Sequence, residues 1–282
     1  NYFKSKARLF SEILNRSGVA IINNRNKYGS KILEICKNNN IKTISYGINC
    51  GDWKIFNIKK GIKKTRFSIE YNKNFYDLEC PIFAEYQLEN LVCAIIIIHH
   101  YGVSIKKILK SIKNIQLPKG RLTRVKSTLR KEYPLIFIDY AHTPVALKES
   151  LLELKKINKN RGNLVLVFGC GGDRDEGKRK NMAEVAEKYA NRIYITDDNP
   201  RYENALKIRK DISKYCKNAK SIGDRKKAIS EAIKSLRIND ILLIAGKGHE
   251  QYQEIKGKFF PFDDELVVKK LILNKGKYGS CL

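Results

Sequence analysis

Several features that would assign this chain to a simple class are scarce or absent. Its 282 residues include one Met, one Trp, four His and six Pro, and 29 acidic residues stand against 56 basic ones. No run of about 18 apolar residues occurs, so we expect no transmembrane helix. The chain starts at Asn1 without an initiator Met and without the basic, apolar and small-residue regions of a signal peptide. We therefore expect a cytoplasmic protein and a chain that begins inside a longer one.

Disulfide and phosphate-loop motifs are also missing. Seven cysteines are scattered along the chain without a C-x-x-C pair, and an odd count fits poorly with a disulfide framework. We expect reduced thiols, as in a cytoplasm. No G-x-x-x-x-G-K-[ST] pattern is present, and no Ser or Cys lies in a strained nucleophile turn. Within this chain, P-loop and hydrolase chemistry therefore both lack support.

The formal net charge of +27 is the strongest bias in the composition. It could mark a nucleic-acid binder, or it could reflect drift toward Lys, Ile and Asn through AT-rich codons. The lysines are spread along the whole chain and are not interleaved with aromatic residues in a nucleic-acid motif. This distribution favours compositional drift, so we expect neither a nucleic-acid nor a membrane partner, although a basic surface would attract anionic substrates.

The first part of the chain shows few regular patterns. We expect helices at 6–14 and 31–36 and short strands at 19–22, 43–46 and 67–71. One long buried helix is expected at 85–99. His99 and His100 end the buried helix, and no acidic or Cys partner lies at ligand spacing, which favours a solvated helix end over a metal site. The turn sequence Gln116–Gly120 then breaks the pattern. We place a domain boundary there, between residues 1–119 and 120–282.

From residue 121, apolar runs alternate with helical patterns. The runs cover 135–138, 164–168, 193–195 and 241–245, with a weaker one at 219–222, and the helical patterns cover 144–157, 179–190, 203–216, 225–236 and 264–273. Thr143 and Pro144 would cap and start one helix, and Asp224 would cap another. The alternation predicts an α/β fold, with a Rossmann-like domain whose mostly parallel sheet is covered by helices on both faces.

A polar or glycine-rich segment directly follows each of the four main apolar runs. These segments are Asp139–Pro144, Gly169–Asp175, Thr196–Arg201 and Gly246–Glu250. In a parallel sheet they would meet at the carboxyl edge, where α/β proteins bind their ligands. We therefore expect one binding site to which all four segments contribute.

The segment after the second run combines glycines with an arginine. Its glycines suit a tight strand-to-helix turn whether or not a ligand approaches the backbone. Arg174, at the mouth of this turn, can grip a carboxylate through two parallel hydrogen bonds. The alternative is a surface ion pair between Arg174 and one of the neighbouring acids, Asp173, Asp175 or Glu176.

The string Asp198-Asn199-Pro200-Arg201 follows the third run. Pro200 restrains its own backbone and that of Asn199, so the segment should be rigid. Arg201 offers a second fork for a carboxylate, and Asp198 and Asn199 offer acceptors for an ammonium group. A ligand with carboxylates and ammonium groups at separate ends would suit this string, although a capped helix-entry turn remains the alternative.

The first and last segments add further polar groups. Glu250 could accept an ammonium group, and Lys247 beside it could serve a phosphate, although no P-loop pattern surrounds it. Asp139 and His142 could form a general-base pair, or they could bind a ribose or a phosphate.

Together these segments resemble the C-terminal half of the Mur ligase family, in particular its diaminopimelate-adding branch. Asp139–Pro144, Phe168–Arg179, Thr196–Arg201 and Ala245–Glu250 match that family's strings in order and spacing. Gly120-Arg121 resembles the Gly-Arg that opens its third domain, and the helix Tyr86–Ala94 resembles the asparagine-bearing helix of its central ATPase domain. The resemblance implies that residues 1–119 are the end of the central ATP-binding domain and that residues 120–282 are the amino-acid-binding domain.

An activity is implied by the same resemblance. Such a ligase adds meso-diaminopimelate to UDP-N-acetylmuramoyl-L-Ala-D-Glu in peptidoglycan synthesis, through an acyl phosphate and with ATP and Mg²⁺. The P-loop, a carbamylated lysine, the magnesium ligands and the nucleotide-sugar site would precede residue 1. The protein would then be a monomer, or would need its N-terminal half.

The resemblance also implies site residues. Four residues would face ATP: Asn90, Arg121, Asp139 and His142. Seven would bind diaminopimelate: Arg174, Asp198, Asn199, Pro200, Arg201, Gly246 and Glu250. Gln87 departs from the pattern, because the family usually has an asparagine there, and Lys180-Asn181 replaces a usual Pro-Leu. A lysine-adding ligase, a folylpolyglutamate synthase and a non-catalytic ligand-binding fragment remain as alternatives.

Overall fold

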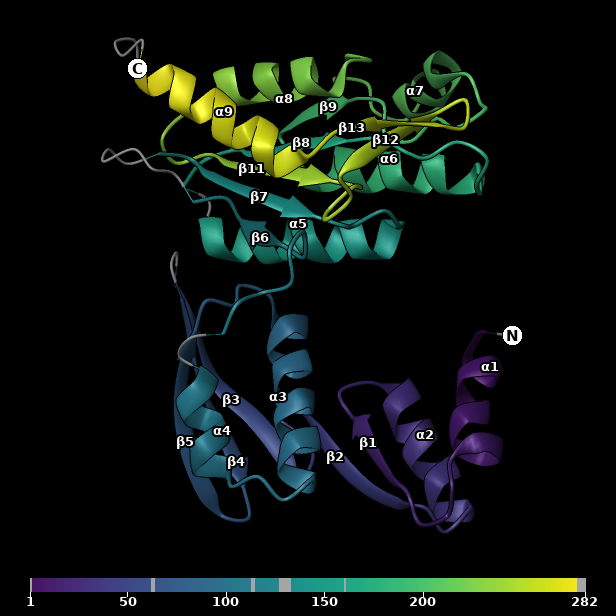
Figure 1. Cartoon of the computed structure of the whole chain (residues 1–282), viewed down its shortest axis with the longest axis vertical. Coiled ribbons are helices and arrows are strands. Elements are labelled where there is room, and N and C mark those ends of the chain that lie inside the picture. Colours follow the sequence, from purple (N-terminus) through teal and green to yellow (C-terminus); the bar gives the residue numbers. More distant parts are fainter. Residues whose placement is uncertain (1, 62–63, 113–114, 127–132, 160, 278–282) are drawn as a thin grey trace. The chain divides into compact units, whose positions relative to one another are not determined.

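The computed structural model describes residues 2–61, 64–112, 115–126, 133–159 and 161–277, with side chains as far as Leu273. It divides into two compact units, residues 1–116 and 117–282, and each has its own sheet (Figure 1). The division falls within the turn sequence Gln116–Gly120.

A mixed five-stranded sheet forms the centre of the first unit, in the order β1-β2-β3-β4-β5. The strands are β1 (Val19–Asn23), β2 (Lys42–Ile48), β3 (Trp53–Lys60), β4 (Thr65–Tyr71) and β5 (Asn74–Cys80). β1, β2 and β3 are parallel, and β4 pairs antiparallel with both β3 and β5. The expected strands at 19–22, 43–46 and 67–71 are confirmed, whereas β3 and β5 were not predicted.

The helices of this unit are α1 (Tyr2–Arg8), α2 (Lys27–Asn38), α3 (Glu85–His100) and α4 (Ile105–Ile112), with one wider helical turn at Leu9–Ile13. α2 packs Ile32 and Cys36 against Ala20 and Ile22 of β1. α3 confirms the expected buried helix, but α4 was not predicted. His100 at the end of α3 is exposed, as expected for a solvated helix end, but His99 is half-buried. The His99 Nδ1 lies 2.9 Å from the carbonyl oxygen of Val103, and its ring contacts those of Trp53 and Tyr71.

The second unit has a six-stranded sheet in the order β10-β9-β8-β11-β7-β6. The strands are β6 (Thr123–Arg124), β7 (Leu135–Asp139), β8 (Leu164–Phe168), β9 (Arg192–Ile195), β10 (Lys220–Ser221) and β11 (Ile241–Ala245). All of them run parallel except β6, which pairs antiparallel with β7. A separate hairpin joins β12 (Tyr252–Ile255) to β13 (Lys258–Pro261). The predicted α/β fold with a mostly parallel sheet is confirmed.

Helices cover both faces of this sheet (Figure 1). They are α5 (Pro144–Asn158), α6 (Gly177–Tyr189), α7 (Ala205–Ser213), α8 (Arg225–Lys234) and α9 (Asp264–Lys277). α8 and α9 pack on one face, and α5 and α6 lie on the other. β8 and β11 are buried at every position because helices cover them on both sides, which explains their continuous apolar sequences. The predicted caps are confirmed: Thr143 accepts a hydrogen bond from Ala146 N, and Asp224 accepts one from Lys227 N.

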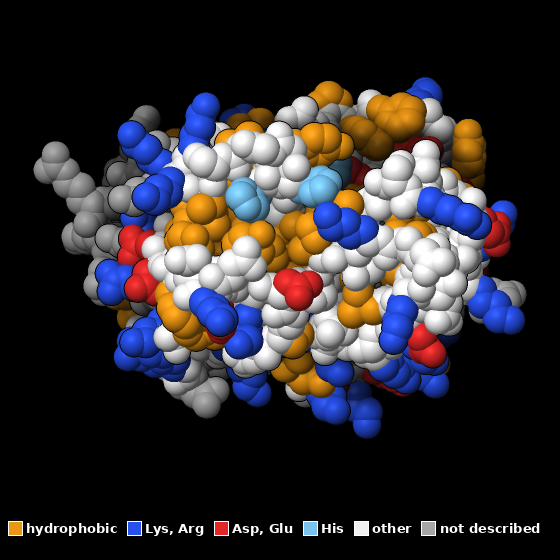
Figure 2. Space-filling model, turned by 90° about the horizontal axis from the view of Figure 1, so that it is seen from below, with side chains coloured by type: hydrophobic (Ala, Val, Ile, Leu, Met, Phe, Trp, Pro, Cys, Tyr) orange, Lys and Arg blue, Asp and Glu red, His pale blue; other side chains and the backbone are white. Residues whose placement is uncertain are grey.

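Figure 2 shows one face of the molecule with its side chains coloured by type. On the face in Figure 2, lysine and arginine side chains lie mostly around the margin, and hydrophobic side chains and two histidines lie nearer the middle. This face therefore shows no continuous basic stripe. Among the described residues, no helix is both long enough and apolar enough to cross a membrane.

Candidate functional site

The four polar segments lie along one edge of the sheet in the second unit. They follow β9, β8, β11 and β7, which are neighbours in that order and parallel, so their carboxyl ends share the edge. Backbone hydrogen bonds join adjacent segments: Gly172 N donates to Asn199 O at 2.9 Å, and Gly246 N donates to Asp139 O at 3.1 Å. The structure thus brings together the segments that the sequence analysis expected to converge.

Asn199 is 3% exposed and is held by groups from two other segments. Its Oδ1 accepts hydrogen bonds from Lys247 Nζ at 2.7 Å and from the backbone N of Glu254 at 3.1 Å. Its Nδ2 donates to Glu250 Oε2 at 2.9 Å, and Lys247 Nζ lies 3.2 Å from the same oxygen. We call Asn199, Lys247 and Glu250 the Asn–Lys–Glu triad.

The contacts within the triad change what we expected of Lys247 and Asn199. The Lys247 side chain is 0% exposed and bonded within the triad, so the suggestion that it serves a phosphate is wrong. The Asn199 oxygen already accepts two hydrogen bonds, so this amide has only an N–H left to offer a ligand. Glu250 keeps one oxygen, Oε1, without a partner among the described residues, and that oxygen is not fully buried.

Arg201 is fixed by its backbone and by its side chain. Its φ of +52° is unusual for a residue with a side chain, and it pairs with the β12 strand, with Arg201 N donating to Glu254 O at 3.0 Å. Its Nε lies 3.0 Å from Glu254 Oε2, and its Nη1 donates to Gly172 O at 2.8 Å. Nη2 donates no hydrogen bond within the described part of the chain, so a positioned donor is available for a carboxylate.

Arg174 is exposed and forms no ion pair with any described residue, so the surface-pair alternative is not observed. The turn that carries it is held by its neighbour Asp173, whose φ is +51°. Asp173 Oδ2 accepts from Tyr202 N at 3.0 Å, and Asp173 N donates to Glu203 Oε2 at 3.3 Å. The turn is therefore anchored to the residues that follow Arg201, although the arginine itself is free to meet a ligand.

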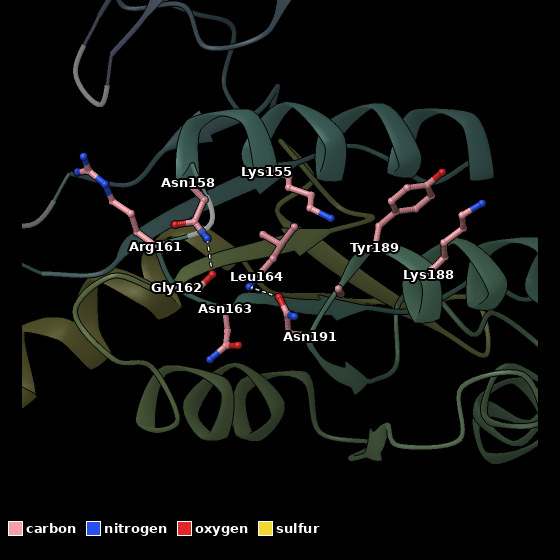
Figure 3. Close-up of a pocket in the computed structure, with 10 residues that line it drawn as sticks. Lys155, Asn158, Arg161, Gly162, Asn163, Leu164, Lys188, Tyr189 and Asn191 are labelled. Carbon is pink, nitrogen blue, oxygen red and sulfur yellow. Dashed lines mark hydrogen bonds between the residues drawn. The ribbon is translucent and has the colours of Figure 1, made fainter.

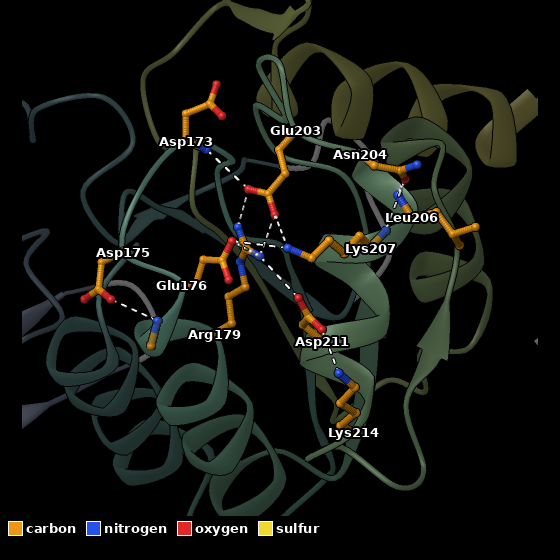
Figure 4. Close-up of polar contacts among 11 residues, drawn as sticks. Asp173, Asp175, Glu176, Arg179, Glu203, Asn204, Leu206, Lys207, Asp211 and Lys214 are labelled. Atoms are coloured by element: carbon orange, nitrogen blue, oxygen red, sulfur yellow. Dashed lines mark hydrogen bonds and ion pairs between the residues drawn. The ribbon is translucent and has the colours of Figure 1, made fainter.

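A polar network behind this turn fixes Glu203 (Figure 4). Arg179, whose side chain is almost fully buried, donates to both Glu203 oxygens at 2.7 and 2.5 Å and to Asp211 at 3.3 Å. The Arg179 guanidinium lowers the pKa of Glu203 below its usual value. Arg179 comes from α6, Asp211 from α7 and Glu203 from the segment just before α7, and Figure 4 shows their side chains meeting next to Asp173. The network therefore fixes the carboxylate that accepts from Asp173 N.

Asp198 faces the interior instead of the site surface. Its Oδ1 accepts from Asn199 N at 2.9 Å, and its Oδ2 lies 3.9 Å from Nη1 of the buried Arg225. Gly246 passes close to this carboxylate with a φ of +114°, and a Cβ there would lie 2.6 Å from Asp198 Oδ2. Asp198 therefore anchors the string, and the position of Gly246 leaves no room for a side chain.

The ring of Tyr140, directly after β7, is in contact with three other side chains. The guanidinium of Arg121 lies 4.8 Å from the centre of its ring, and the rings of His142 and His249 lie 4.6 and 5.1 Å away. Asp139 is buried, and burial raises its pKa. Its oxygens accept hydrogen bonds from Leu122 N and the Ser150 hydroxyl, so Asp139 supports the fold of this edge while Arg121 and His142 are exposed.

The remaining expected residues lie on α3 of the first unit. Asn90 is exposed on this helix. Gln87 is buried near its start, and its Oε1 accepts hydrogen bonds from Phe83 N at 3.2 Å and Ala84 N at 3.1 Å. The departure from the family pattern at Gln87 therefore caps the helix.

A pocket of about 510 Å³ opens at the other edge of the second sheet (Figure 3). It lies at the start of β8 and is lined by the ends of α5 and α6. Its charged residues, Lys155, Arg161 and Lys188, are all exposed. Because ligands of parallel α/β sheets bind at the carboxyl edge, we do not assign the site to this pocket.

Comparison with known proteins matches both units. A model of the Mur ligase middle domain matches residues 1–98, and a model of the Mur ligase glutamate ligase domain matches residues 120–248. The UDP-N-acetylmuramoyl-L-alanyl-D-glutamate–2,6-diaminopimelate ligase of Rickettsia conorii is 39% identical over 274 residues, which are 96% of this chain and 56% of the relative. The ligase of the same name from Anaplasma marginale is 38% identical over 273 residues, with 96% and 55% covered.

Solved structures agree with this result. A structure of a ligase with the same name aligns with a TM-score of 0.63 at 32% identity, over 99% of this chain and 57% of the other. A folylpolyglutamate synthase from Mycobacterium tuberculosis aligns with a TM-score of 0.66 at 15% identity, over 99% of this chain and 59% of the other, which shows a shared fold.

The chain belongs to the Mur ligase family of ATP-dependent amide ligases and carries its middle-domain and C-terminal-domain sequence. Within that family, the curated relatives named above are 2,6-diaminopimelate ligases, and the chain spans about half of their length.

Proposed function

We propose that this chain is the amino-acid-receiving part of a ligase that adds meso-diaminopimelate to UDP-N-acetylmuramoyl-L-Ala-D-Glu in peptidoglycan synthesis. One observation carries the proposal: two arginines and one carboxylate, Arg174, Arg201 and Glu250, stand on segments that share one edge of the sheet. Identity of 39% with a ligase named for 2,6-diaminopimelate supports the choice of substrate.

The charges on this edge suit a ligand that has both a carboxylate and an ammonium group away from its reacting amine. Nη2 of Arg201 and the exposed guanidinium of Arg174 would take carboxylates, since arginine forms strong, directional hydrogen bonds with them. Oε1 of Glu250 would take the ammonium group. Lysine lacks the second carboxylate, so one of the two arginines would remain without its charged hydrogen-bond partner, and that contribution to binding energy would be lost.

The proposed reaction forms an amide in two steps. ATP transfers its terminal phosphoryl group to the free carboxylate of the precursor, and the amine of diaminopimelate then attacks the acyl carbon while phosphate leaves and the amine loses a proton. The second unit would hold the amine near the acyl carbon and exclude water from the acyl phosphate. Arg121 and His142 in this unit, and Asn90 in the first, are the residues we propose to face ATP.

Mg²⁺ would accompany ATP in this reaction, but the described residues do not form a site for it. No group of three or more His, Cys, Asp or Glu side chains within the described ranges could hold a metal ion. Asp139, three residues before His142, uses both oxygens within the fold. We therefore derive no step through the metal and assign none of its ligands here.

The proposal is tested first by ligand binding. Isothermal titration of the chain with meso-diaminopimelate, L-lysine and L-glutamate should show binding of diaminopimelate and at least roughly tenfold weaker binding of the others, because they leave an arginine or a carboxylate unpaired. Preference for lysine or glutamate would instead favour a lysine-adding ligase or a folylpolyglutamate synthase.

Turnover separates the ligase from the non-catalytic alternative. The protein is supplied with ATP, Mg²⁺, the UDP-linked dipeptide and diaminopimelate, and phosphate release and the tripeptide product are measured. Product formation supports the ligase. Binding of diaminopimelate without product formation by the full-length protein would favour a ligand-binding fragment.

A further inference from the structure

Lys247 is a fully buried cation that the proposed function does not use. It follows Gly246 at the end of β11, and its side chain is 0% exposed. Its ammonium lies 2.7 Å from Asn199 Oδ1, 3.2 Å from Glu250 Oε2 and 5.8 Å from the centre of the Tyr252 ring. Burial of an ammonium group costs free energy unless hydrogen-bond acceptors or a counter-charge surround it. These contacts therefore stabilise Lys247, and they also restrict the orientations that Asn199 and Glu250 can adopt.

The first constraint falls on the amide of Asn199. An ammonium group has only donors, so the amide atom that faces Lys247 must be the oxygen. The amide nitrogen is then directed at Glu250, to which it donates at 2.9 Å. Rotation of the amide by 180° would set N–H groups against the ammonium and an oxygen against the carboxylate, so Lys247 permits only one of the two orientations.

The second constraint falls on the carboxylate of Glu250. Both donors, Asn199 Nδ2 and Lys247 Nζ, meet the same oxygen, Oε2. The other oxygen, Oε1, has no partner among the described residues and is not fully buried. One oxygen of Glu250 is thus tied inward, and the other faces outward.

Building on the proposed function, we propose that Lys247 is a positioning residue of the diaminopimelate site. It acts through Asn199: it fixes the orientation of that amide, whose N–H group holds Oε2 of Glu250 so that Oε1 can meet the ammonium group of the ligand. Lys247 itself does not contact the ligand. Its substitution should therefore weaken diaminopimelate binding only while Asn199 is present.

A double-mutant cycle on the whole chain tests this role. Lys247→Met keeps the length of the side chain and removes the charge, and Asn199→Ala removes the amide. Titration with meso-diaminopimelate should show roughly tenfold weaker binding for each single variant, because a charge-assisted hydrogen bond is lost in each case. The double variant should bind no more weakly than Asn199→Ala alone. Additive losses would show that Lys247 acts independently of Asn199 and would overturn the proposal.

Two controls separate positioning from folding. Lys258→Met makes the same substitution at an exposed lysine of β13 and should leave diaminopimelate affinity unchanged. If Lys247→Met does not fold, Asn199→Asp replaces it in the test, since an aspartate still accepts from Lys247 but cannot donate to Glu250. A folded Asn199→Asp chain should bind diaminopimelate at least roughly tenfold more weakly, and unchanged affinity would overturn the proposal.

A measurement without ligand keeps this inference separate from the proposed function. In ¹⁵N NMR spectra, the side-chain NH₂ signal of Asn199 is identified by its loss in Asn199→Asp. That signal should move in Lys247→Met and stay in place in Lys258→Met. Failure of the wild-type chain to bind diaminopimelate would refute the proposed function, whereas an unmoved NH₂ signal in Lys247→Met would refute the role of Lys247.

Discussion

Arg225 and Asp264 form an ion pair whose two side chains are both 0% exposed. Arg225, at the start of α8, donates from Nε and Nη2 to the two oxygens of Asp264, at the start of α9, over 2.8 and 2.7 Å. Nη2 also donates to the carbonyl oxygen of Ala245, the last residue of β11, at 3.1 Å. Burial opposes the charge of Arg225, but Asp264 holds its pKa above the usual value. One arginine therefore joins α9 to the edge of the sheet that carries the candidate site.

Replacement of Asp264 should strongly destabilise the second unit. Asp264→Ala leaves the buried guanidinium of Arg225 with only the more distant carboxylate of Asp198, 3.9 Å from Nη1, among the described ion pairs. Removal of one partner from a buried pair costs about 3–5 kcal/mol in comparable cases. Urea unfolding followed by far-ultraviolet circular dichroism measures the loss. The fluorescence of Trp53, the single tryptophan, reports on the first unit and should change less.

The matched control is an exposed ion pair on the same helix. Lys269 lies 2.6 Å from Glu265, and its side chain is 47% exposed, so Lys269→Ala should change the free energy of unfolding by less than about 1 kcal/mol. An equally small effect of Asp264→Ala would show that the buried pair does not hold α9 in place.

The strands that could be predicted most readily from the sequence are those that are equally buried on both faces of the sheet. β8 and β11 are buried on both faces, so their sequences are wholly apolar and easy to recognise. β3 and β5 were missed because each carries charged or amide side chains at several positions, and only some of their residues are buried. The hairpin of β12 and β13 was missed because β13 is exposed at all four positions, so its residues do not alternate between a buried and an exposed face.

A similar limit applies to the candidate site. The strand-end segments could be predicted because parallel strands place their carboxyl ends together. The partners of each side chain depend on which strands are neighbours, and β11 lies between β8 and β7 although it comes much later in the chain. The sequence therefore gave no sign that Asp198 meets Arg225, or that Lys247 is buried against Asn199.

Arg201→Ala should weaken the use of meso-diaminopimelate by about 2–4 kcal/mol, because a half-buried carboxylate of the ligand loses its charged partner. The measurement is kcat/KM for diaminopimelate in the complete enzyme, or the dissociation constant for this chain. Arg161→Ala, in the pocket at the other edge of the sheet, is the matched control and should have no effect. Unchanged kinetics in Arg201→Ala would refute the site assignment.

Arg174→Ala should weaken diaminopimelate binding without changing stability. Arg174 is exposed and has no ion pair within the described part of the chain, so its removal breaks no contact of the folded protein. Arg201, by contrast, bonds Gly172 and Glu254, so its substitution should also lower the melting temperature. Calorimetric titration and thermal unfolding of both variants check this difference, and a comparable loss of stability in Arg174→Ala would show that the arginine is part of the fold.

The Arg179–Glu203 pair should make stability depend on acid pH. Arg179 lowers the pKa of Glu203 below the reference value of 4.5, so the folded protein binds this proton less tightly than the unfolded chain does. The stabilisation is therefore fully present above pH 4.5 and is lost as the pH falls through the folded-state pKa. Glu203→Gln removes this contribution, so its unfolding free energy should fall less steeply with acid than that of the wild type.

The comparison requires urea unfolding at several pH values below neutrality, with Glu149→Gln on the exposed side of α5 as the control. Because Glu203 also accepts a hydrogen bond from Asp173 N, acid should loosen the turn that carries Arg174 as well as the network behind it. Diaminopimelate binding should then weaken in the same acid range as stability, and more steeply in the wild type than in Glu203→Gln. Parallel pH profiles for wild type and Glu203→Gln would show that the pair does not link this turn to the fold.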